Sequence, residues 1–248
     1  MNKTGISWTD YTWNPVSGCT KVSEGCKFCY AEALSKRWGR SFNVTLHPEK
    51  LKEVNKIPPG SKVFVNSMSD LFHEDVPDEF VNKVIKSMAS RPDITFQILT
   101  KRPELMRIKF GNGSIDRMPE NVWIGVSVEL RKYLGRVEEL VCMADNYSFR
   151  GASFISFEPL LEDIGPIKFD YLYAVDWIII GGESGPHHRP MNIEWARNLV
   201  RQAKEYNVAV WMKQLGGLYP GGNLEDFPED LRIREFPGET KMMEAAKL

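Results

Sequence analysis

Six apolar runs rich in β-branched residues recur along the chain, and each ends in polar or glycine residues. Their apolar residues are almost continuous instead of alternating with polar ones, which is typical of strands covered on both faces. Stretches with helical periodicity lie between them, at residues 78–90, 131–144 and 193–206. Strand and helix alternate at roughly 30-residue intervals, which is the rhythm of a parallel βαβ sheet. The six runs are KVFVNSMSD (62–70), ITFQILTKR (94–102), NVWIGVSVE (121–129), ASFISFEPL (152–160), DWIIIGGES (176–184) and NVAVWMKQL (207–215).

This alternation predicts an α/β fold, a partial (β/α)6-type, TIM-like barrel of parallel strands. A further strand near residues 6–13 would precede the six runs. A chain of 248 residues can bury the core of such a barrel, and no low-complexity linker divides it. We therefore expect one domain over residues 1–248, with a cysteine-bearing loop at about 14–38 and a C-terminal extension at about 216–248.

Charge and hydropathy narrow the class of protein. The net charge is −1, from 32 lysines and arginines against 33 aspartates and glutamates. This balance argues against a general nucleic-acid coat but leaves a local basic groove open. The first residues have no apolar leader segment, and the longest apolar run, WIIIGG from Trp177, is too short to span a bilayer. We expect a cytoplasmic protein without a membrane partner.

Three of the four cysteines lie within eleven residues, in the segment GCTKVSEGCKFC. Cys19, Cys26 and Cys29 have the spacing C-x6-C-x2-C, which indicates a metal site and does not form a disulfide framework. The fourth cysteine, Cys142, falls in the apolar pattern of a predicted helix, and we expect it to be a buried core residue. The sequence therefore offers three clustered thiolates and leaves the fourth ligand undecided.

Two kinds of metal site accept three thiolates. In the first, His47 completes a Cys3His zinc site, and the protein is a zinc-stabilised nucleic-acid or protein binding module without catalysis. In the second, the thiolates hold a [4Fe–4S] cluster, which takes one bond per iron and keeps one iron open. An open iron can bind the amino and carboxylate groups of S-adenosyl-L-methionine (SAM) and cleave it reductively. We favour the cluster, because the loop follows the first strand of a predicted barrel and Phe28 can shield a cluster from water.

Polar residues end all six predicted strands. The carboxyl ends of parallel barrel strands meet at one edge, where the active sites of such barrels lie. A ring of charged and hydroxyl residues at that edge favours a binding site for a polar ligand, although exposed loops are also polar in general. These strand-end residues are Ser69, Asp70, Lys101, Arg102, Ser127, Glu129, Glu158, Glu183, Ser184, Lys213 and Gln214.

An ordered set of motifs extends from about residue 6 to residue 236: WNPVSGCTKVSEGCKFCYA, VNSMSDLFHEDVP, QILTKRP, IGVSVE, FEPL, IIGGESG and WMKQLG. Together they resemble the phage Gp37/Gp68 family, also called DUF5131, which is similar to a divergent branch of the radical SAM enzymes. The chain also resembles the spore photoproduct lyase group at Asn14 and Pro15 and at three strand ends, Ser69–Asp70, Thr100–Lys101 and Ser127. Two features differ from those enzymes. The first cysteine gap has six residues instead of three, and VNSMSD lacks the hydrogen-donating cysteine of the lyases, so we do not expect repair of the same DNA lesion.

The resemblance implies an enzyme that uses a [4Fe–4S] cluster on Cys19, Cys26 and Cys29 to form a 5′-deoxyadenosyl radical from SAM. It also implies an electron donor such as flavodoxin or ferredoxin, and it is compatible with a protein partner. By their chemistry, carboxylates, hydroxyls and a lysine at the strand ends suit the amino-acid and ribose groups of SAM. The residues implied for SAM are Tyr30, Ser69, Asp70, Lys101, Ser127, Glu129, Glu158, Gly182 and Glu183.

The predicted substrate is a nucleotide or a nucleic acid. The loop GPHHRPMN after the fifth run places two histidines and an arginine at the same edge, and aromatic residues are frequent nearby. Cations interleaved with aromatic rings suit phosphates and bases. The bland alternatives are solvated loop histidines and tryptophans that belong to the core. The residues assigned to the substrate are Arg102, His187, His188, Arg189 and Lys213.

Overall fold

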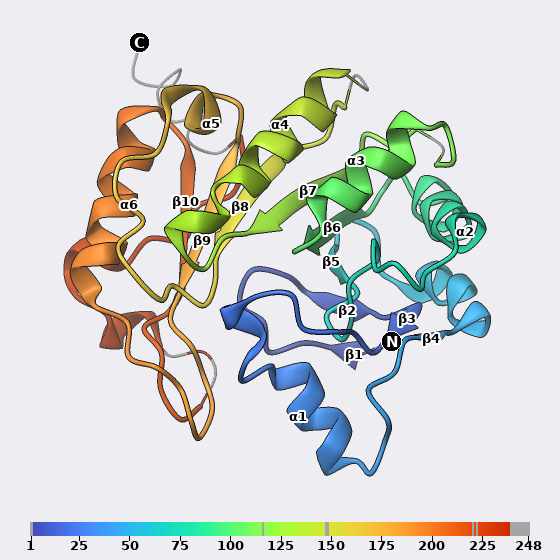
Figure 1. The fold of residues 1–248 in the computed structure, drawn as a ribbon, viewed down its shortest axis with the longest axis horizontal. Helices are drawn as coiled ribbons and strands as arrows, with labels where there is room; N and C mark the ends of the chain where they lie inside the picture. Colours follow the sequence, from blue (N-terminus) through green and yellow to red (C-terminus); the bar gives the residue numbers. More distant parts are fainter. Residues whose placement is uncertain (1, 116, 147–148, 220, 222, 239–248) are drawn as a thin grey trace.

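The computed structural model describes residues 2–115, 117–146, 149–219, 221 and 223–238. Eight strands form one sheet in the order β1-β2-β5-β6-β7-β8-β9-β10, in which β1 is antiparallel to β2 and every other pairing is parallel. The sheet curls into a half-barrel (Figure 1). Its strands are β1 (Asn2–Lys3), β2 (Tyr11–Trp13), β5 (Lys62–Val65), β6 (Thr95–Thr100), β7 (Val122–Ser127), β8 (Ser153–Phe157), β9 (Trp177–Gly181) and β10 (Ala209–Gln214).

The predicted fold class is confirmed: seven strands of the described chain run parallel in an α/β half-barrel. Each of the six apolar runs contains one of the strands β5 to β10, and β2 lies in the segment predicted to precede them. Two further short strands, β3 (Val16–Ser17) and β4 (Thr45–Leu46), pair antiparallel in a separate sheet. They lie on either side of the cysteine loop and of α1 in the sequence.

Helices cover the outer face of the sheet, whereas α1 projects on its own beside the strand ends (Figure 1). The three predicted helices are present; the segment predicted at 131–144 starts as a 3-10 turn, Arg131–Tyr133, before α4 begins. Glu194 at the start of α6 donates its backbone N–H to the side chain of Asn192, which caps the helix. The helices are α1 (Tyr30–Arg37), α2 (Asp78–Ala89), α3 (Pro103–Gly111), α4 (Gly135–Asn146), α5 (Phe169–Tyr173) and α6 (Ile193–Glu205), and the other 3-10 segments are η1 (Glu24–Cys26), η2 (Pro48–Lys56), η4 (Leu224–Asp226) and η5 (Glu229–Leu231).

The strands divide their side chains between two cores because successive residues point to opposite faces. On β5, Val63 and Val65 belong to the large core under the helices, while Phe64 belongs to a second cluster inside the half-barrel. This inner cluster consists mainly of aromatic rings. We call it the aromatic layer: Trp8, Phe64, Trp123, Phe154, Trp177, Trp211 and Phe236.

The aromatic layer fills the half-barrel at the amino ends of its strands. The Trp177 ring lies in the middle of it, with ring centroids of Trp8, Trp123, Phe154, Trp211 and Phe236 between 5.5 and 6.2 Å away. Gly125 on β7 leaves the space for Phe154, because a Cβ at Gly125 would lie 2.4 Å from that ring. The half-barrel is therefore closed below by apolar packing.

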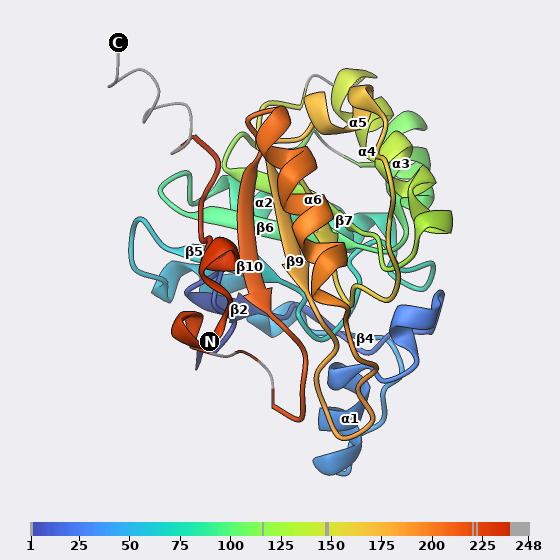
Figure 2. The ribbon, with the colours of Figure 1, turned by 90° about the vertical axis from the view of Figure 1, so that its left-hand side faces the viewer.

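A C-terminal segment covers the β10 edge of the sheet (Figure 2). Met212 donates its N–H to Ile233 at 2.9 Å and Glu235 donates to Val210 at 2.9 Å, in an antiparallel pairing of Trp211 with Arg234. This segment brings Phe236 into the aromatic layer. Part of the extension predicted at about 216–248 lies outside the described residues, at 220, 222 and 239–248. Among the helices described, none has the length and apolar character needed to cross a bilayer.

Candidate functional site

The cysteine loop, residues 18–29, lies across the carboxyl ends of β5 to β7. Gly18 donates its N–H to the Met68 carbonyl at 3.0 Å, and Cys19 donates to the Phe42 carbonyl at 3.1 Å. Gly18 has φ +84°, and a Cβ there would lie 2.1 Å from the Asn43 carbonyl oxygen, so only glycine allows this approach. The loop therefore begins at a fixed position beside the end of β5.

Cys19 lies against a buried arginine. The Arg102 guanidinium donates to Cys19 Sγ at 3.4 Å, to the Thr20 carbonyl at 3.2 Å and to Thr20 Oγ1 at 2.7 Å. Arg102 is 4% exposed, and its other partners are Glu74 at 3.0 Å and Asp70 at 3.5 Å. Burial and the charge of Asp70 raise the pKa of the Cys19 thiol to about 11, against the opposing effect of Arg102. Metal binding at Cys19 must therefore displace a proton.

Asp70 joins the ends of β5 and β6. Its carboxylate accepts the Thr100 hydroxyl at 2.8 Å and the Lys101 N–H at 3.0 Å. Next to it, fully buried His73 accepts the Asp75 N–H at Nδ1, so its Nε2 donates to Thr20 Oγ1 at 2.8 Å. Desolvation of the His73 ring, together with the charge of Arg102, lowers the pKa of His73, which keeps it neutral. The first half of the loop is thus held by strand-end groups.

Cys26 lies above a second buried network, centred on Glu129. This carboxylate has no exposed side-chain surface and accepts Ser23 Oγ at 2.7 Å, Lys101 Nζ at 3.1 Å and Arg136 at 2.8 Å. Desolvation by burial acts against ionisation, but the charges of Lys101 and Arg136 still lower the pKa of Glu129. Burial likewise opposes the charge of Lys101, yet Glu129 and the Cys26 thiolate raise the pKa of Lys101. Both groups therefore remain charged.

A glycine sets how closely the loop approaches Glu129. A Cβ at Gly25 would lie 2.5 Å from the Glu129 carboxylate, so any larger residue would push η1 away from the strand end. Ser23 Oγ also lies 3.5 Å from Cys26 Sγ. On the outside of the loop, Lys132 and the Tyr133 hydroxyl bind the Glu24 carboxylate. The second half of the loop is fixed from both sides.

Cys29 immediately precedes α1, and the first helical residue, Tyr30, faces the barrel. The Tyr30 hydroxyl donates to the Ser67 carbonyl, and the charges of Cys29 and Glu158 both act on it. Glu158 at the end of β8 pairs with Lys213 of β10 at 2.7 Å. Glu158 and Lys213 thus form one ion pair between the ends of β8 and β10.

The loop after β9 contacts the cysteine loop from the other side. Arg189 donates its backbone N–H and its Nε to Glu183, each at 2.8 Å, and its Nη2 to the Glu24 carbonyl at 2.9 Å. The Phe28 ring lies 5.8 Å from the His187 ring and 5.4 Å from the Arg189 guanidinium. Phe28 is therefore covered by the residues of this loop.

The remaining predicted site residues contact the backbone or are buried at a strand end. Ser69 Oγ donates to the Val16 carbonyl at 2.9 Å, and the His188 ring lies 2.8 Å from the Gly185 carbonyl. Ser127 is 1% exposed at the end of β7. A Cβ at Gly182 would lie 2.4 Å from the Leu215 carbonyl, so the close approach that this glycine allows is to the neighbouring backbone.

The three cysteine thiols are each partly exposed. Within the described part of the chain, no group of three or more histidine, cysteine, aspartate or glutamate side chains converges on the position of a single metal ion. Both ring nitrogens of His47 have contacts away from the cysteines, with Ser17 Oγ at 2.8 Å and with Glu49 at 3.2 Å. A [4Fe–4S] cluster takes one thiolate per iron and does not need its ligands to meet at one point.

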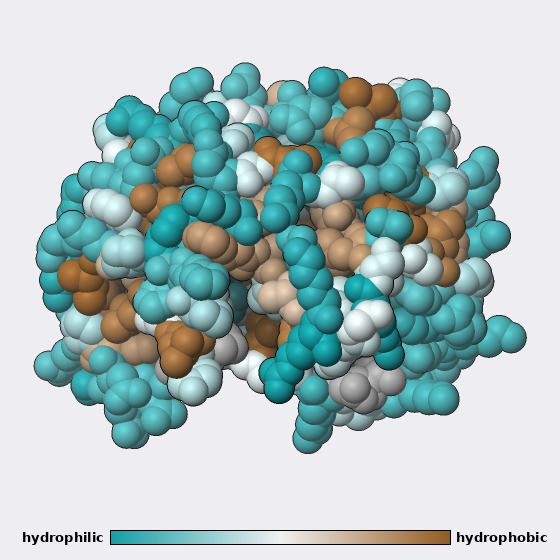
Figure 3. Space-filling model, turned by 60° about the horizontal axis from the view of Figure 1, so that its bottom comes forward, coloured by the Kyte–Doolittle hydropathy of each residue, from teal (hydrophilic) through white to brown (hydrophobic). Residues whose placement is uncertain are grey.

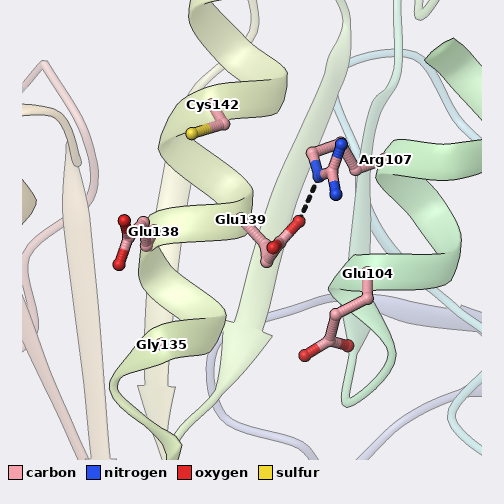
Figure 4. A pocket seen from close by; sticks show the side chains of 6 residues that line it. All are labelled: Glu104, Arg107, Gly135, Glu138, Glu139 and Cys142. Carbon is pink, nitrogen blue, oxygen red and sulfur yellow. Dashed lines mark hydrogen bonds and ion pairs between the residues drawn. The ribbon is translucent and has the colours of Figure 1, made fainter.

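The prediction that Cys142 is a core residue is wrong, because Cys142 is exposed. The buried face of α4 carries Val137, Leu140 and Met143, and position 142 lies off that face. Figure 4 shows Cys142 on α4 among the residues that line a surface hollow beside α3 and α4. The hollow is lined by Glu104, Arg107, Gly135, Glu138, Glu139 and Cys142.

The face that carries the cysteine loop is notched. Figure 3 shows this face with polar groups around the notch and apolar atoms, in brown, behind it. A ligand at the strand ends would thus meet both kinds of surface.

Nearly the whole chain matches one protein-family model. This model, described as a protein of unknown function (DUF5131), matches residues 3–243. The chain belongs to the DUF5131 family. The resemblance seen in the motifs is thus confirmed, and among curated proteins no sequence matches this DUF5131 chain.

Among solved structures, this DUF5131 chain is similar to spore photoproduct lyase. For the lyase complexed with dinucleoside spore photoproduct, the identity is 10% and the TM-score is 0.48, and the match covers 82% of this chain and 63% of the lyase chain. For a mutant of the lyase with bound AdoMet and dinucleoside spore photoproduct, the identity is 10%, the TM-score is 0.47 and the coverage is the same. The DUF5131 chain therefore spans less than two thirds of the lyase.

Sequence reasoning missed several residues that fix the cysteine loop. Two of them, Thr20 and Ser23, lie within the loop, His73 bonds to Thr20, and Arg136 bonds to Glu129, which accepts the Ser23 hydroxyl. Arg136 could have been noticed in the sequence, because it is a cation beside Val137 on the side of α4 that faces the core, where charged residues are rare. The sequence indication for His73 is weaker: it lies three residues after Asp70 at the end of β5. Thr20 and Ser23 look like ordinary loop residues, and only the folded chain shows their partners.

Proposed function

We propose that this protein is a radical SAM enzyme whose Cys19, Cys26 and Cys29 hold a [4Fe–4S] cluster. One observation carries the proposal: the three partly exposed thiols lie on a loop fixed across the carboxyl ends of a parallel half-barrel. Cations stand beside two of them, because Arg102 donates to Cys19 and the charge of Cys26 acts on Lys101. Thiolates near positive groups are the donors that iron–sulfur clusters use.

When bound, such a cluster keeps one iron free for SAM and supplies the electron that cleaves SAM to a 5′-deoxyadenosyl radical. The protein's own residues bind and orient the cofactor. Tyr30 follows Cys29 directly in the chain, and Glu158 and Lys213, which pair with each other at 2.7 Å, carry a carboxylate and an ammonium group that complement the two charges of an amino acid. Ser127, buried at the end of β7, adds a hydroxyl to the set of strand-end groups assigned to SAM.

The other residues assigned to SAM have a different part in this proposal. Asp70 accepts the Lys101 N–H, the Lys101 ammonium group pairs with Glu129, and Glu129 accepts the Ser23 hydroxyl of the cysteine loop. Glu183 is bonded to Arg189. Their role is to hold the loop and its thiols in place. Ser69 and Gly182 act through the backbone, which they fix beside Val16 and Leu215. The aromatic layer excludes water from below the site.

We assign a nucleotide or nucleic-acid substrate to the site, with an electron donor of the flavodoxin or ferredoxin type. His187 is exposed on the β9 loop and lies against Phe28, so an imidazole and an aromatic ring border the cysteine loop. Such groups stack on bases and contact phosphates. Arg102, by contrast, is buried beneath Cys19 and is not available to a substrate.

The experiment is anaerobic reconstitution with iron and sulfide, followed by electron paramagnetic resonance of the reduced protein with and without SAM. We expect a reduced-cluster signal that changes when SAM is added, because SAM binds the open iron. The matched variants are Cys29→Ser, which should lose the signal, and His47→Ala, which should keep it. A protein that takes up no iron and carries one equivalent of zinc, lost in His47→Ala, would overturn the proposal.

A further inference from the structure

The cations that were predicted to form a substrate-binding patch are paired within the protein. Arg102 is bound to Asp70 and Glu74, Arg189 to Glu183, and Lys213 to Glu158. An ion pair that is already complete adds little attraction for a polyanion. Positive charge that remains free near the site must therefore lie elsewhere.

Such charge lies on the second part of the cysteine loop and on α1. Residues 21–40 contain five lysines and arginines against two glutamates, a net charge of +3 in a chain whose total is −1. Lys21 and Lys36 share one carboxylate, Glu32, at 3.0 and 2.7 Å. Lys27, Arg37 and Arg40 are exposed, and in the described part of the chain no carboxylate pairs with them.

An exposed tryptophan lies among these cations. Trp38 directly follows α1 and is 55% exposed, whereas Trp8, Trp13, Trp177 and Trp211 are at most 6% exposed. The Arg40 guanidinium lies 5.5 Å from the centre of the Trp38 ring. Cations at a helix C-terminus also interact with the helix dipole, which accounts for Lys36 and Arg37. It accounts neither for an exposed indole nor for Lys27 before the helix.

We propose that Lys27, Arg37, Trp38 and Arg40 form a binding surface for single-stranded nucleic acid, which delivers the substrate to the cysteine loop. The cations contact phosphates and the Trp38 ring stacks on a base. A single strand is the occupant, because a duplex buries its base faces in its own stack while an unpaired base is free to stack on an aromatic ring. An acidic protein would satisfy the cations without using the exposed indole face.

The position of this surface gives it a role in the reaction. Cys29 ends the loop and α1 begins at the next residue, so Trp38 lies nine residues, or roughly 13 Å along the helix axis, from Cys29, at about 1.5 Å per residue. A strand on α1 would therefore reach the notched face (Figure 3). This inference rests on the proposed function for the class of substrate, but the binding itself requires no cluster.

The test is fluorescence anisotropy of a short labelled oligothymidylate with the full chain, with and without reconstituted iron, over a range of salt concentrations. We expect Trp38→Ala to weaken binding at least about fivefold, the lower value for loss of one base–aromatic stack. The double variant Arg37→Gln/Arg40→Gln should reduce the slope of log K against log salt by about 1.4, since each phosphate contact contributes about 0.7.

Matched controls are Tyr173→Ala, an aromatic residue that is 77% exposed on α5, and Arg201→Gln on α6. Both variants should leave oligonucleotide binding unchanged.

The proposed binding surface would be overturned if the wild type does not bind at low salt, or if the control variants lose as much affinity as Trp38→Ala. Duplex binding as tight as single-strand binding, without dependence on Trp38, would also overturn it. If the chain never takes up a cluster but still binds the oligonucleotide, the binding surface is supported and the proposed function is not. If the chain binds SAM but not the oligonucleotide, the binding surface is overturned and the proposed function stands.

Discussion

The two ends of the half-barrel are built from opposite kinds of residue. At the amino ends of the strands, the aromatic layer packs rings around Trp177 with few polar atoms. At the carboxyl ends, Asp70, Arg102 and Glu129 are buried to the same degree but are charged, and each is bonded to several partners. Apolar packing stabilises the amino end of the half-barrel, because contacts between buried rings are not directional. The charged end depends on individual pairs, and those pairs hold the cysteine loop.

The largest expected effect is at the aromatic end. Trp177→Ala should lower the free energy of unfolding by about 4 kcal/mol, because it removes a fully buried ring that contacts five others and leaves a cavity. Urea unfolding followed by circular dichroism measures this. The folded fraction should still take up iron in the normal amount. Loss of iron uptake from folded Trp177→Ala would show that the two ends are not independent.

A charge deletion at the other end should cost somewhat less stability. Glu129→Ala leaves the half-buried Lys101 and the buried Arg136 without their shared carboxylate, and we expect a loss of about 3 kcal/mol in the free energy of unfolding. The control, Glu205→Ala, removes the partner of Arg201 on the exposed face of α6 and should change stability by less than about 0.5 kcal/mol. Equal losses in the two variants would mean that the Glu129 network contributes no more than a surface pair.

Arg102→Lys tests whether the charged end positions the metal ligands. Lysine keeps the charge but cannot bond to Cys19, Thr20 and Glu74 at once, as the guanidinium does. Affinity for the cluster should fall about tenfold, as is usual when a group that orients a metal ligand is changed. The measurement is iron and sulfide per chain and the rate of iron loss to a chelator. Arg197→Lys on α6 is the control, and normal iron retention in Arg102→Lys would rule out the positioning role.

The smallest effect is a dependence on pH. Because the folded pKa of Glu129 is lowered, the stability that this carboxylate contributes is complete above its ordinary pKa of 4.5. It is lost as the pH falls through the folded pKa, by at most about 1.4 kcal/mol per pH unit. The difference in unfolding free energy between wild type and Glu129→Gln should therefore be constant at neutral pH and narrow in acid. A difference that stays constant below pH 4.5 would contradict this.

The sequence predicted the fold well because the fold depends on apolar pattern. The runs that became β5 to β10 have the continuous hydrophobicity of strands covered on both faces, and the inner and outer cores account for it. The same apolar pattern gave the wrong prediction for Cys142. Its sequence neighbours are apolar, but position 142 lies on the solvent side of α4. The pattern also left open which tryptophans are buried. Trp38 is exposed while Trp13 is fully buried, although both stand in aromatic, polar segments.

The sequence predicted that the polar strand ends lie at one edge of the sheet, but it did not predict how their side chains pair. Polar strand ends located Asp70, Lys101 and Glu129 at one edge, since parallel strands end together. Which cation meets which carboxylate depends on side-chain geometry across elements that are far apart in the sequence. Lys213 was assigned to a substrate and Glu158 to SAM, yet the two are 2.7 Å apart. Arg102 likewise lies under Cys19, a contact across 83 residues that no local pattern reveals.

The covering of β10 by residues 233–235 has a consequence for association between molecules. An open sheet edge presents unpaired N–H and carbonyl groups to any other strand, and it is a common starting point for aggregation. Here Ile233 and Glu235 take up those groups on β10, and β1 lies on the outer side of β2 at the opposite edge. Both margins of the sheet therefore end in short antiparallel segments. A curved sheet finished in this way resists growth by strand addition.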